Sequence, residues 1–236
     1  MEEAIKIGDT QLVWVETPNN PNWEVTDIEA ASKLAHKAEA KLIVDATATP
    51  PTMTKSLDLG ADISFHSATK YLNGHSDVSA GVLSFKQSNQ DWESLYNIRK
   101  LQGTVLNSQD AFLLIRGLRT LFLRVDKNSL NAMILAKHFE SHDNVETVLY
   151  PGLESHPNHI IAKRQTNVAL CQVYGLAHTP LVRYDGASSS LALRNLRVLR
   201  CLLGGRQAKS EVCYLLCAHG QRRPLRLARY DLDYRR

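Results

Sequence analysis

The chain contains 236 residues, of which 44% are hydrophobic and 22% are charged. At roughly 150 residues per domain, this length predicts one large domain or one and a half smaller ones. Both percentages are close to the average of soluble globular proteins, which excludes disordered, fibrous and disulfide-framework classes. The first ten residues are acidic and polar, and no uncharged run is long enough to cross a bilayer. We therefore expect a soluble cytoplasmic protein without a membrane partner.

The formal net charge of +4 is unevenly distributed. Residues 1–166 contain 16 Lys and Arg against 20 Asp and Glu, a balance of −4, whereas residues 167–236 contain 12 against 4, a balance of +8. The second part has 11 Arg and one Lys, and it holds all four cysteines: Cys171, Cys201, Cys213 and Cys217. Such a change in composition predicts a boundary near Gln165.

The basic tail, residues 167–236, allows three interpretations. It could neutralise phosphates, but it lacks interleaved aromatic residues and zinc-finger spacing, so we do not expect a nucleic-acid partner. Cys213, Cys217 and His219 could bind a metal, but no second pair of ligands follows, so we predict no metal site and reduced, free cysteines. We favour a third interpretation, that a reading-frame or splice change produced a tail with which the preceding fold was not selected.

The beginning of the chain predicts a βαβ unit. Residues 12–15 form a short apolar run that ends at Glu16 and Thr17-Pro18, as a buried strand would. Thr26 and Glu29 have capping-box spacing, and apolar residues follow with a helical period up to Ala38. A second apolar run, residues 42–44, ends at Asp45. This order of strand, helix and strand indicates an α/β fold with a parallel sheet.

Further along, residues 61–66 and 81–85 predict two more strands, separated by the polar segment 67–77. Residues 91–142 have a helical period, and we expect the strongly apolar section 112–123 to be buried. Residues 145–150 again predict a strand.

Three strand ends carry the residues with chemical potential. Ligands of open α/β sheets bind at the carboxyl ends of the strands, where Glu16 and Asp45 stand, although a single carboxylate there most often caps a helix. Ser67, Thr69 and Lys70 follow another strand and combine two hydroxyls with a primary amine, without the glycines of a nucleotide-binding loop. A lysine beside an anion site and a carboxylate predicts a cofactor with an aldehyde, a phosphate and a basic pyridine nitrogen.

The motifs of residues 12–165 resemble those of the pyridoxal-phosphate (PLP) enzymes of cysteine and methionine metabolism, which include cystathionine γ-lyase, cystathionine γ-synthase, cystathionine β-lyase and methionine γ-lyase. The matching segments cover about two thirds of the chain in family order. They are VWVETPNNP at 13–21, IVDAT at 43–47, LGADI at 59–63, SATKYLNGHSDV at 67–78, RGLRTL at 116–121, and YPGL and SHP within 150–157. Ala46 and Ala48 depart from the family's usual Asn and Phe.

The resemblance implies a fold and a domain division. The expected fold is the large domain of a type I PLP-transferase, like that of aspartate aminotransferase, with a mixed, mostly parallel sheet and a long helix. Residues 1–125 would form a partial PLP-binding domain, residues 126–166 the start of an incomplete C-terminal domain, and residues 167–236 the divergent tail.

The resemblance also implies roles for single residues. Lys70 would hold the cofactor covalently and then move protons between substrate carbons, which makes it the catalytic residue. Asp45 would keep the pyridine nitrogen protonated, so that the ring can accept electrons. Ser67 and Thr69 would bind the phosphate, and Thr47 would lie against the ring. Glu16 would be a further cofactor-binding residue, and Asn20 would bind the substrate.

The activity implied is an elimination or replacement on sulfur amino acids in transsulfuration, most like that of cystathionine γ-lyase. The alternatives are cystathionine γ-synthase or methionine γ-lyase chemistry, or an impaired fragment that acts only as a subunit partner. Family members are dimers or tetramers, so a homo-oligomer is implied. The family's upstream phosphate turn and ring-stacking tyrosine, and its downstream carboxylate-binding arginine, do not align with this chain, and we therefore expect weak cofactor binding and little turnover.

Overall fold

The computed structural model describes residues 1, 3–143, 145–166, 181–185 and 215–218, the last two ranges as backbone only. Its first sheet contains β1 (Leu12–Glu16), β2 (Lys41–Asp45), β3 (Ile63–Ser67) and β4 (Gly81–Phe85), in that spatial order. The first three strands are parallel and β4 is antiparallel to β3. This mixed, mostly parallel sheet with helices confirms the predicted α/β class.

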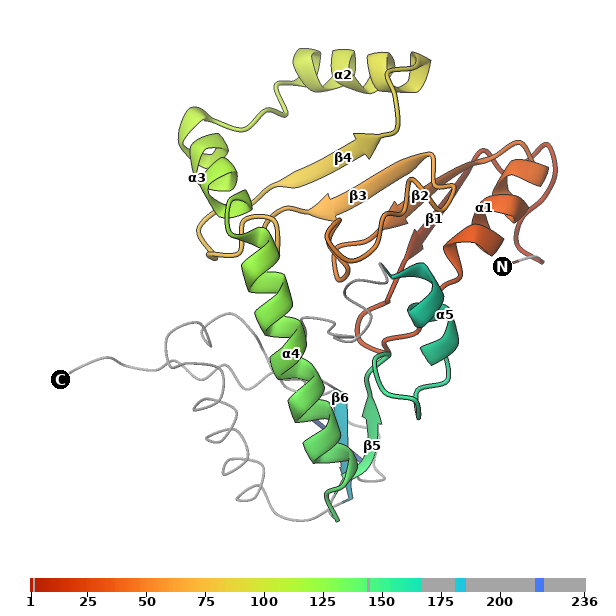
Figure 1. The fold of residues 1–236 in the computed structure, drawn as a ribbon. Coiled ribbons are helices and arrows are strands. Elements are labelled where there is room, and N and C mark those ends of the chain that lie inside the picture. Colours follow the sequence, from red (N-terminus) through yellow and green to blue (C-terminus); the bar gives the residue numbers. More distant parts are fainter. Residues whose placement is uncertain (2, 144, 167–180, 186–214, 219–236) are drawn as a thin grey trace.

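Helix α1 (Ile28–Lys37) crosses from β1 to β2 and covers one face of the sheet (Figure 1). The core between them consists of alanine and branched aliphatic side chains, among them Val13, Val15, Ile28, Ala31, Ala35, Leu42 and Val44. The capping-box prediction at Thr26 was wrong, because Asp27 is the N-cap and its carboxylate accepts a hydrogen bond from the Ala30 N–H at 3.2 Å. Thr26 is instead tied to the end of β1, where its N–H donates to Thr17 Oγ1 at 3.0 Å.

Strand β1, predicted as a buried strand, is buried on one face only. Val13 and Val15 face α1, whereas Leu12 and Trp14 on the other face are each 51% exposed. Strand β1 lies at the edge of the described sheet, and successive side chains of a strand point to opposite faces. Trp14 packs against Phe65 of β3, with ring centroids 5.4 Å apart.

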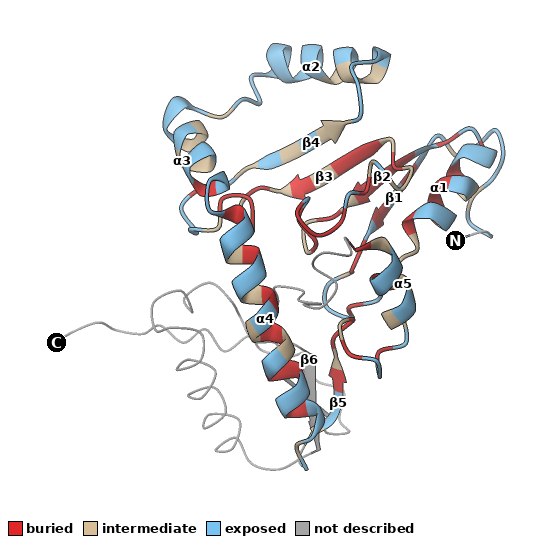
Figure 2. Ribbon diagram, in the orientation of Figure 1, coloured by how far each residue is buried: buried red, intermediate tan, exposed pale blue. Residues whose placement is uncertain are grey.

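The helical region predicted after residue 91 consists of α2 (Gln90–Gln102), α3 (Ser108–Leu118) and α4 (Leu121–Glu140). The predicted burial of residues 112–123 was wrong, since Phe112 is 61% exposed and Leu123 is 73% exposed. In α3 only Gly117 is buried. Figure 2 shows α2 and α3 coloured mostly as exposed, because within the described residues no other layer packs over their outer faces.

Helix α4 runs from the first sheet to a second one, formed by β5 (Val145–Leu149), β6 (Leu181–Asp185) and β7 (Leu215–Ala218) (Figure 1). Strand β6 is antiparallel to β5 and parallel to β7. The second half of α4 packs on β5 through a core that includes Trp23, Leu135, Phe139, Val148 and Tyr150. The predicted division at residues 125 and 126 falls inside α4, and it stays a prediction.

Helix α5 (His159–Gln165) lies beside the start of α1. Arg164 forms an ion pair with Asp27, and Asn158 Oδ1 accepts a hydrogen bond from the Val25 N–H at 3.1 Å. These contacts connect α5 and the residue before it to the segment that leads into α1. In the part of the chain that the structure describes, no helix combines the length and apolar character that a membrane span requires.

Candidate functional site

The carboxyl ends of the three parallel strands meet at one edge of the sheet. Glu16 pairs in register with Asp45, and Asp45 with Phe65, two residues before Ser67. Paired residues of parallel strands point to the same face, and so do residues two apart on one strand. The side chains of Glu16, Asp45 and Ser67 therefore lie on one face, opposite the face that α1 covers.

A chain of hydrogen bonds connects the ends of β2 and β3. Asp45 Oδ1 accepts hydrogen bonds from the Thr47 N–H at 3.0 Å and from the Thr47 hydroxyl at 2.6 Å. Thr47 Oγ1 in turn accepts a hydrogen bond from the Ser67 N–H at 2.8 Å. All three residues are half-buried. Asp45 Oδ1 is thus held in place, while Oδ2 has no hydrogen bond within the described residues and is available to a donor.

Glu16 places a second carboxylate beside Asp45. Burial, followed by the negative charge of Asp45, raises the pKa of Glu16 above its usual range, and a hydrogen bond from the Asn20 backbone N–H partly offsets this. Two carboxylates so close favour a proton or a cation between them. The electrostatics of this edge therefore suit a ligand with a positively charged N–H group.

The turn that bears Lys70 begins where β3 ends. The Lys70 N–H donates to the Ser67 carbonyl at 3.0 Å, and the Gly74 N–H donates to the Lys70 carbonyl at 2.7 Å. The Lys70 side chain is exposed, and within the described residues its amine has neither a hydrogen bond nor an ion pair. The Ser67 hydroxyl also has no hydrogen bond there. Both groups can therefore bind a ligand without first losing a protein contact.

Thr69 differs from Ser67, because its hydroxyl already has partners. Thr69 Oγ1 accepts a hydrogen bond from the Ala80 N–H at 2.9 Å and donates to the Ala80 carbonyl at 3.3 Å. These bonds close the connection between β3 and β4. To donate to an anion, the hydroxyl would have to turn its proton away from the Ala80 carbonyl, the longer of the two bonds.

Asn20 is the predicted site residue that stands apart. It is exposed in the turn after β1, and its recorded contact with the site is the backbone hydrogen bond to Glu16. The structure thus brings Glu16, Asp45, Thr47 and Ser67 together, with Thr69 and Lys70 on the adjoining turn.

Sequence reasoning missed Arg124, whose guanidinium donates to the carbonyl of Tyr71, the residue after Lys70. The available signal was a single arginine in an otherwise apolar run, residues 121–125. A cation in such a run needs acceptors to be buried.

The donor set fits PLP. Within the described residues the amine of Lys70 is unpaired, Asp45 has one available carboxylate oxygen and the Ser67 hydroxyl has no partner, which match an aldehyde, a pyridinium N–H and a phosphate in turn. In the described part of the chain, no three His, Cys, Asp or Glu side chains gather as a metal ion would require. The group Cys213, Cys217 and His219 lies outside the residues whose side chains the structure describes.

Comparisons with known proteins agree on one family. The model of the family described as "Cys/Met metabolism PLP-dependent enzyme" matches residues 1–179. The chain is 44% identical to an L-methionine gamma-lyase of Fusobacterium nucleatum subsp. polymorphum over 158 residues, covering 66% of this chain and 40% of the relative. It is 47% identical to the human cystathionine gamma-lyase over 217 residues, covering 89% of this chain and 51% of the relative.

Solved structures give the same result. The structure of metB from Corynebacterium glutamicum matches with a TM-score of 0.68 and 43% identity, over 70% of this chain and 43% of that one. A cystathionine gamma-lyase from Lactobacillus plantarum, complexed with L-serine, matches with a TM-score of 0.67 and 38% identity, over 70% and 43%. The chain thus spans about half the length, or less, of these relatives. Coverage of 89% by the human relative also means that similarity extends past the composition boundary at Gln165.

Proposed function

This chain belongs to the Cys/Met metabolism PLP-dependent enzyme family, and from this premise we propose that it binds PLP through Lys70 and acts in elimination or replacement on a sulfur amino acid. The observation that carries the proposal is the position of Asp45. Its available oxygen lies at the same sheet edge as the turn that bears the unpaired Lys70 amine. A pyridine ring that carries an aldehyde needs both groups, the Asp45 carboxylate for its nitrogen and the Lys70 amine for its aldehyde.

Each residue has a physical task in this proposal. Thr47 fixes the Asp45 carboxylate through two hydrogen bonds, so that Oδ2 can accept a hydrogen bond from a protonated ring nitrogen. Glu16 adds negative charge that favours the protonated form of that nitrogen. The Ser67 hydroxyl and, after its proton is redirected, the Thr69 hydroxyl donate to the phosphate.

Lys70 has two tasks. It would hold the cofactor's aldehyde through its amine, which is exposed and has no partner within the described residues, and once the substrate's amino group has displaced it, it would take the proton from the substrate Cα. Bound PLP supplies an electron-accepting ring that stabilises negative charge on the substrate carbons. Asn20, exposed beside Glu16, is the candidate ligand of the substrate carboxylate.

For the substrate we propose cystathionine, cleaved in transsulfuration in the cytoplasm, with methionine γ-cleavage or cystathionine γ-synthase chemistry as the alternatives. Relatives of both lyase types match this chain at similar identity, so the choice needs an assay. Release of a 2-oxo acid from cystathionine, compared with release from methionine, distinguishes the two lyases.

A second candidate function is that of a subunit partner with little activity of its own, in a homo-oligomer. The exposed apolar side chains of α3 and α4 favour it, among them Phe112, Phe122 and Leu123. Apolar patches of this kind on soluble proteins mark association surfaces. We propose that these helices contact another copy of the chain.

Covalent trapping tests the cofactor assignment. The full chain is incubated with PLP, reduced with borohydride, digested and analysed by mass spectrometry. We expect the added mass on the peptide that contains Lys70, with its loss in Lys70→Ala and its retention in Lys86→Ala, a change at another exposed lysine. The proposal would be contradicted if many lysines carried the added mass equally. It would also be contradicted if Lys70→Ala bound as much PLP in total as the unsubstituted chain.

A further inference from the structure

The Arg124 guanidinium binds three acceptors at the junction of α3 and α4. Nη1 donates to the Tyr71 carbonyl at 2.8 Å, Nη2 donates to the Gly117 carbonyl at 2.8 Å, and Nε donates to Thr120 Oγ1 at 3.0 Å. The Gly117 and Thr120 contacts hold the end of α3 against the start of α4. The Tyr71 contact crosses to the β3–β4 connection, which lies beside this junction in Figure 1.

Two glycines make this approach possible. A Cβ on Gly74, which has a φ of +71°, would overlap the Arg124 guanidinium. A Cβ on Gly117 would overlap the backbone carbonyl of Asn73. Both sides of the contact between the turn and the helices therefore lack side chains where the backbones meet. The planar guanidinium fills the space that Gly74 leaves.

The environment of Arg124 is unusual for a cation. The side chain is half-buried, and burial lowers the pKa of Arg124 below its usual range. Within the described residues it forms no ion pair with a carboxylate. Its two Nη groups are matched to backbone carbonyls, an arrangement that needs the rigid fork of arginine. A half-buried cation is destabilising without its acceptors, so the contact resists separation of the turn from the helices.

We propose that Arg124 is a positioning residue that fixes the turn of residues 70–74, and with it the direction of the Lys70 amine. This inference rests on the proposed function, since it is the role of Lys70 that gives the turn its importance. The carbonyl that Arg124 binds follows Lys70 by one residue, and the Gly74 N–H binds the Lys70 carbonyl itself. Holding Tyr71 therefore limits rotation of the backbone from which the amine extends.

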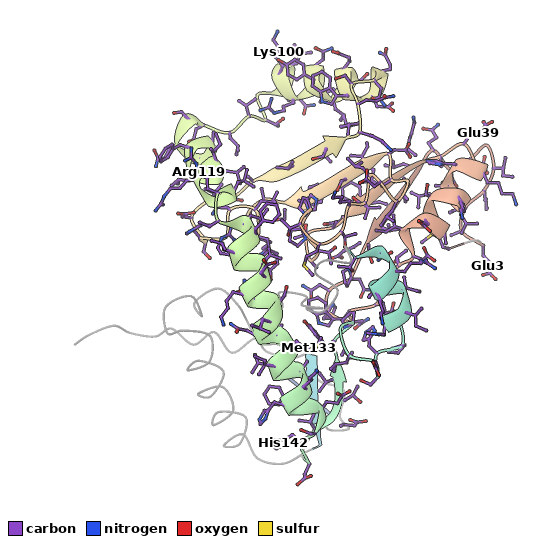
Figure 3. The ribbon with its side chains drawn as sticks, in the orientation of Figure 1. Glu3, Glu39, Lys100, Arg119, Met133 and His142 are labelled. Atoms are coloured by element: carbon purple, nitrogen blue, oxygen red, sulfur yellow. The ribbon has the colours of Figure 1, made fainter. Side chains whose placement is uncertain are left out.

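The first test measures backbone motion without a cofactor. Amide hydrogen exchange is recorded at Asn73 and Gly74, whose N–H groups donate to the Ala68 and Lys70 carbonyls, in the full chain and in Arg124→Met. We expect exchange at both amides to be faster by about tenfold or more, because the turn opens locally once the Arg124 guanidinium no longer holds it. Exchange in β2 should not change. Arg119→Met is the matched control, since Arg119 is exposed at the same junction (Figure 3).

The second test measures the amine. The PLP concentration that half-saturates the absorbance of the lysine-bound cofactor should rise about tenfold in Arg124→Met and stay unchanged in Arg119→Met. If Arg124→Met does not fold, Arg124→Lys replaces it, because lysine keeps the charge and loses the planar fork. In Arg124→Lys we expect the amide exchange rate and the PLP concentration at half-saturation each to rise about threefold.

The outcomes separate the two proposals. Faster exchange together with weaker PLP binding supports the positioning role. Unchanged exchange in the turn overturns it, whatever Lys70 binds. Faster exchange with unchanged half-saturation also overturns it, since Arg124 would then hold the turn without directing the amine. Failure of the unsubstituted chain to bind PLP at Lys70 overturns the proposed function, while exchange still decides whether Arg124 fixes the turn.

Discussion

Replacement of Thr47 by valine tests the link between the ends of β2 and β3. Valine has nearly the shape of threonine, so the change removes the hydroxyl and leaves the packing in place. Two hydrogen bonds disappear with it, the one to Asp45 Oδ1 at 2.6 Å and the one from the Ser67 N–H at 2.8 Å. The Thr47 N–H keeps its own bond to Asp45.

The loss of stability follows from the nature of the two bonds. A hydrogen bond to an ionised acceptor contributes about 1.5–3 kcal/mol, and an amide left without a partner costs about 1–3 kcal/mol when water cannot reach it. Asp45, Thr47 and Ser67 are all half-buried, so water replaces part of what is lost and the lower values apply. We expect Thr47→Val to lower the free energy of unfolding by about 2.5 kcal/mol.

Chemical denaturation of the full chain measures this free energy. Thr104→Val, a change at an exposed threonine, is the control and should alter it by no more than about 0.5 kcal/mol. Borohydride trapping of PLP should weaken in Thr47→Val at the same time, because the Asp45 carboxylate loses one of the two groups that orient it.

A double-mutant cycle with Asp45→Asn identifies the bond responsible. Asparagine keeps an acceptor oxygen and removes the charge, so the cost of Thr47→Val should be smaller by at least about 1 kcal/mol in the Asp45→Asn background. If the two changes add within about 0.5 kcal/mol, the Thr47 hydroxyl does not stabilise the carboxylate, and the reasoning about the site is refuted.

Three further predictions concern Glu16, Gly117, and the pair Phe122 and Leu123. Because the folded state raises the pKa of Glu16, it holds that proton more tightly than the unfolded state, so stability falls as pH rises above about 4.5 through the raised pKa. Glu16→Gln should flatten this decline and be slightly more stable at pH 7, and an unchanged pH profile would contradict the shift. Gly117→Ala should lower the free energy of unfolding by about 1–3 kcal/mol, because its Cβ would overlap the Asn73 carbonyl; no loss would mean that the turn and α3 are not in contact. The combined change Phe122→Ser and Leu123→Ser should abolish self-association in sedimentation experiments and alter unfolding of the monomer by less than about 1 kcal/mol, whereas a large loss in the monomer would show that these side chains are buried within one chain.

The sequence was informative where local periodicity and chain order determine the structure. Apolar runs that end in Glu16 and Asp45, with a helical period between them, can form a βαβ unit, and parallel strands necessarily end at one edge. The position of Lys70 three residues after the end of β3 then follows from the same edge. The predicted roles of these residues still await the trapping experiment.

Sequence reasoning failed where the answer depends on contacts between distant segments. The apolar character of Phe112 and Leu123 indicates that they need cover, but it does not indicate where in the structure that cover is found. The two hydrogen bonds between the Thr69 hydroxyl and the Ala80 backbone depend on how the β3–β4 connection closes. Arg124 finds its acceptor 53 residues away along the chain. None of these contacts leaves a periodic signal.

The electrostatics of the sheet edge connect these local facts to function. Glu16 and Asp45 lie side by side in register, and their mutual repulsion adds to burial in raising the pKa of Glu16, while the Asn20 N–H offsets part of the rise. A protonated ring nitrogen bound at Asp45 Oδ2 would relieve this repulsion, so binding should be stronger because the repulsion exists. Glu16→Gln should therefore have opposite effects, a slightly more stable chain without cofactor and a higher PLP concentration at half-saturation. If Glu16→Gln raises the stability and also lowers the PLP concentration at half-saturation, the second carboxylate does not contribute to binding the ring.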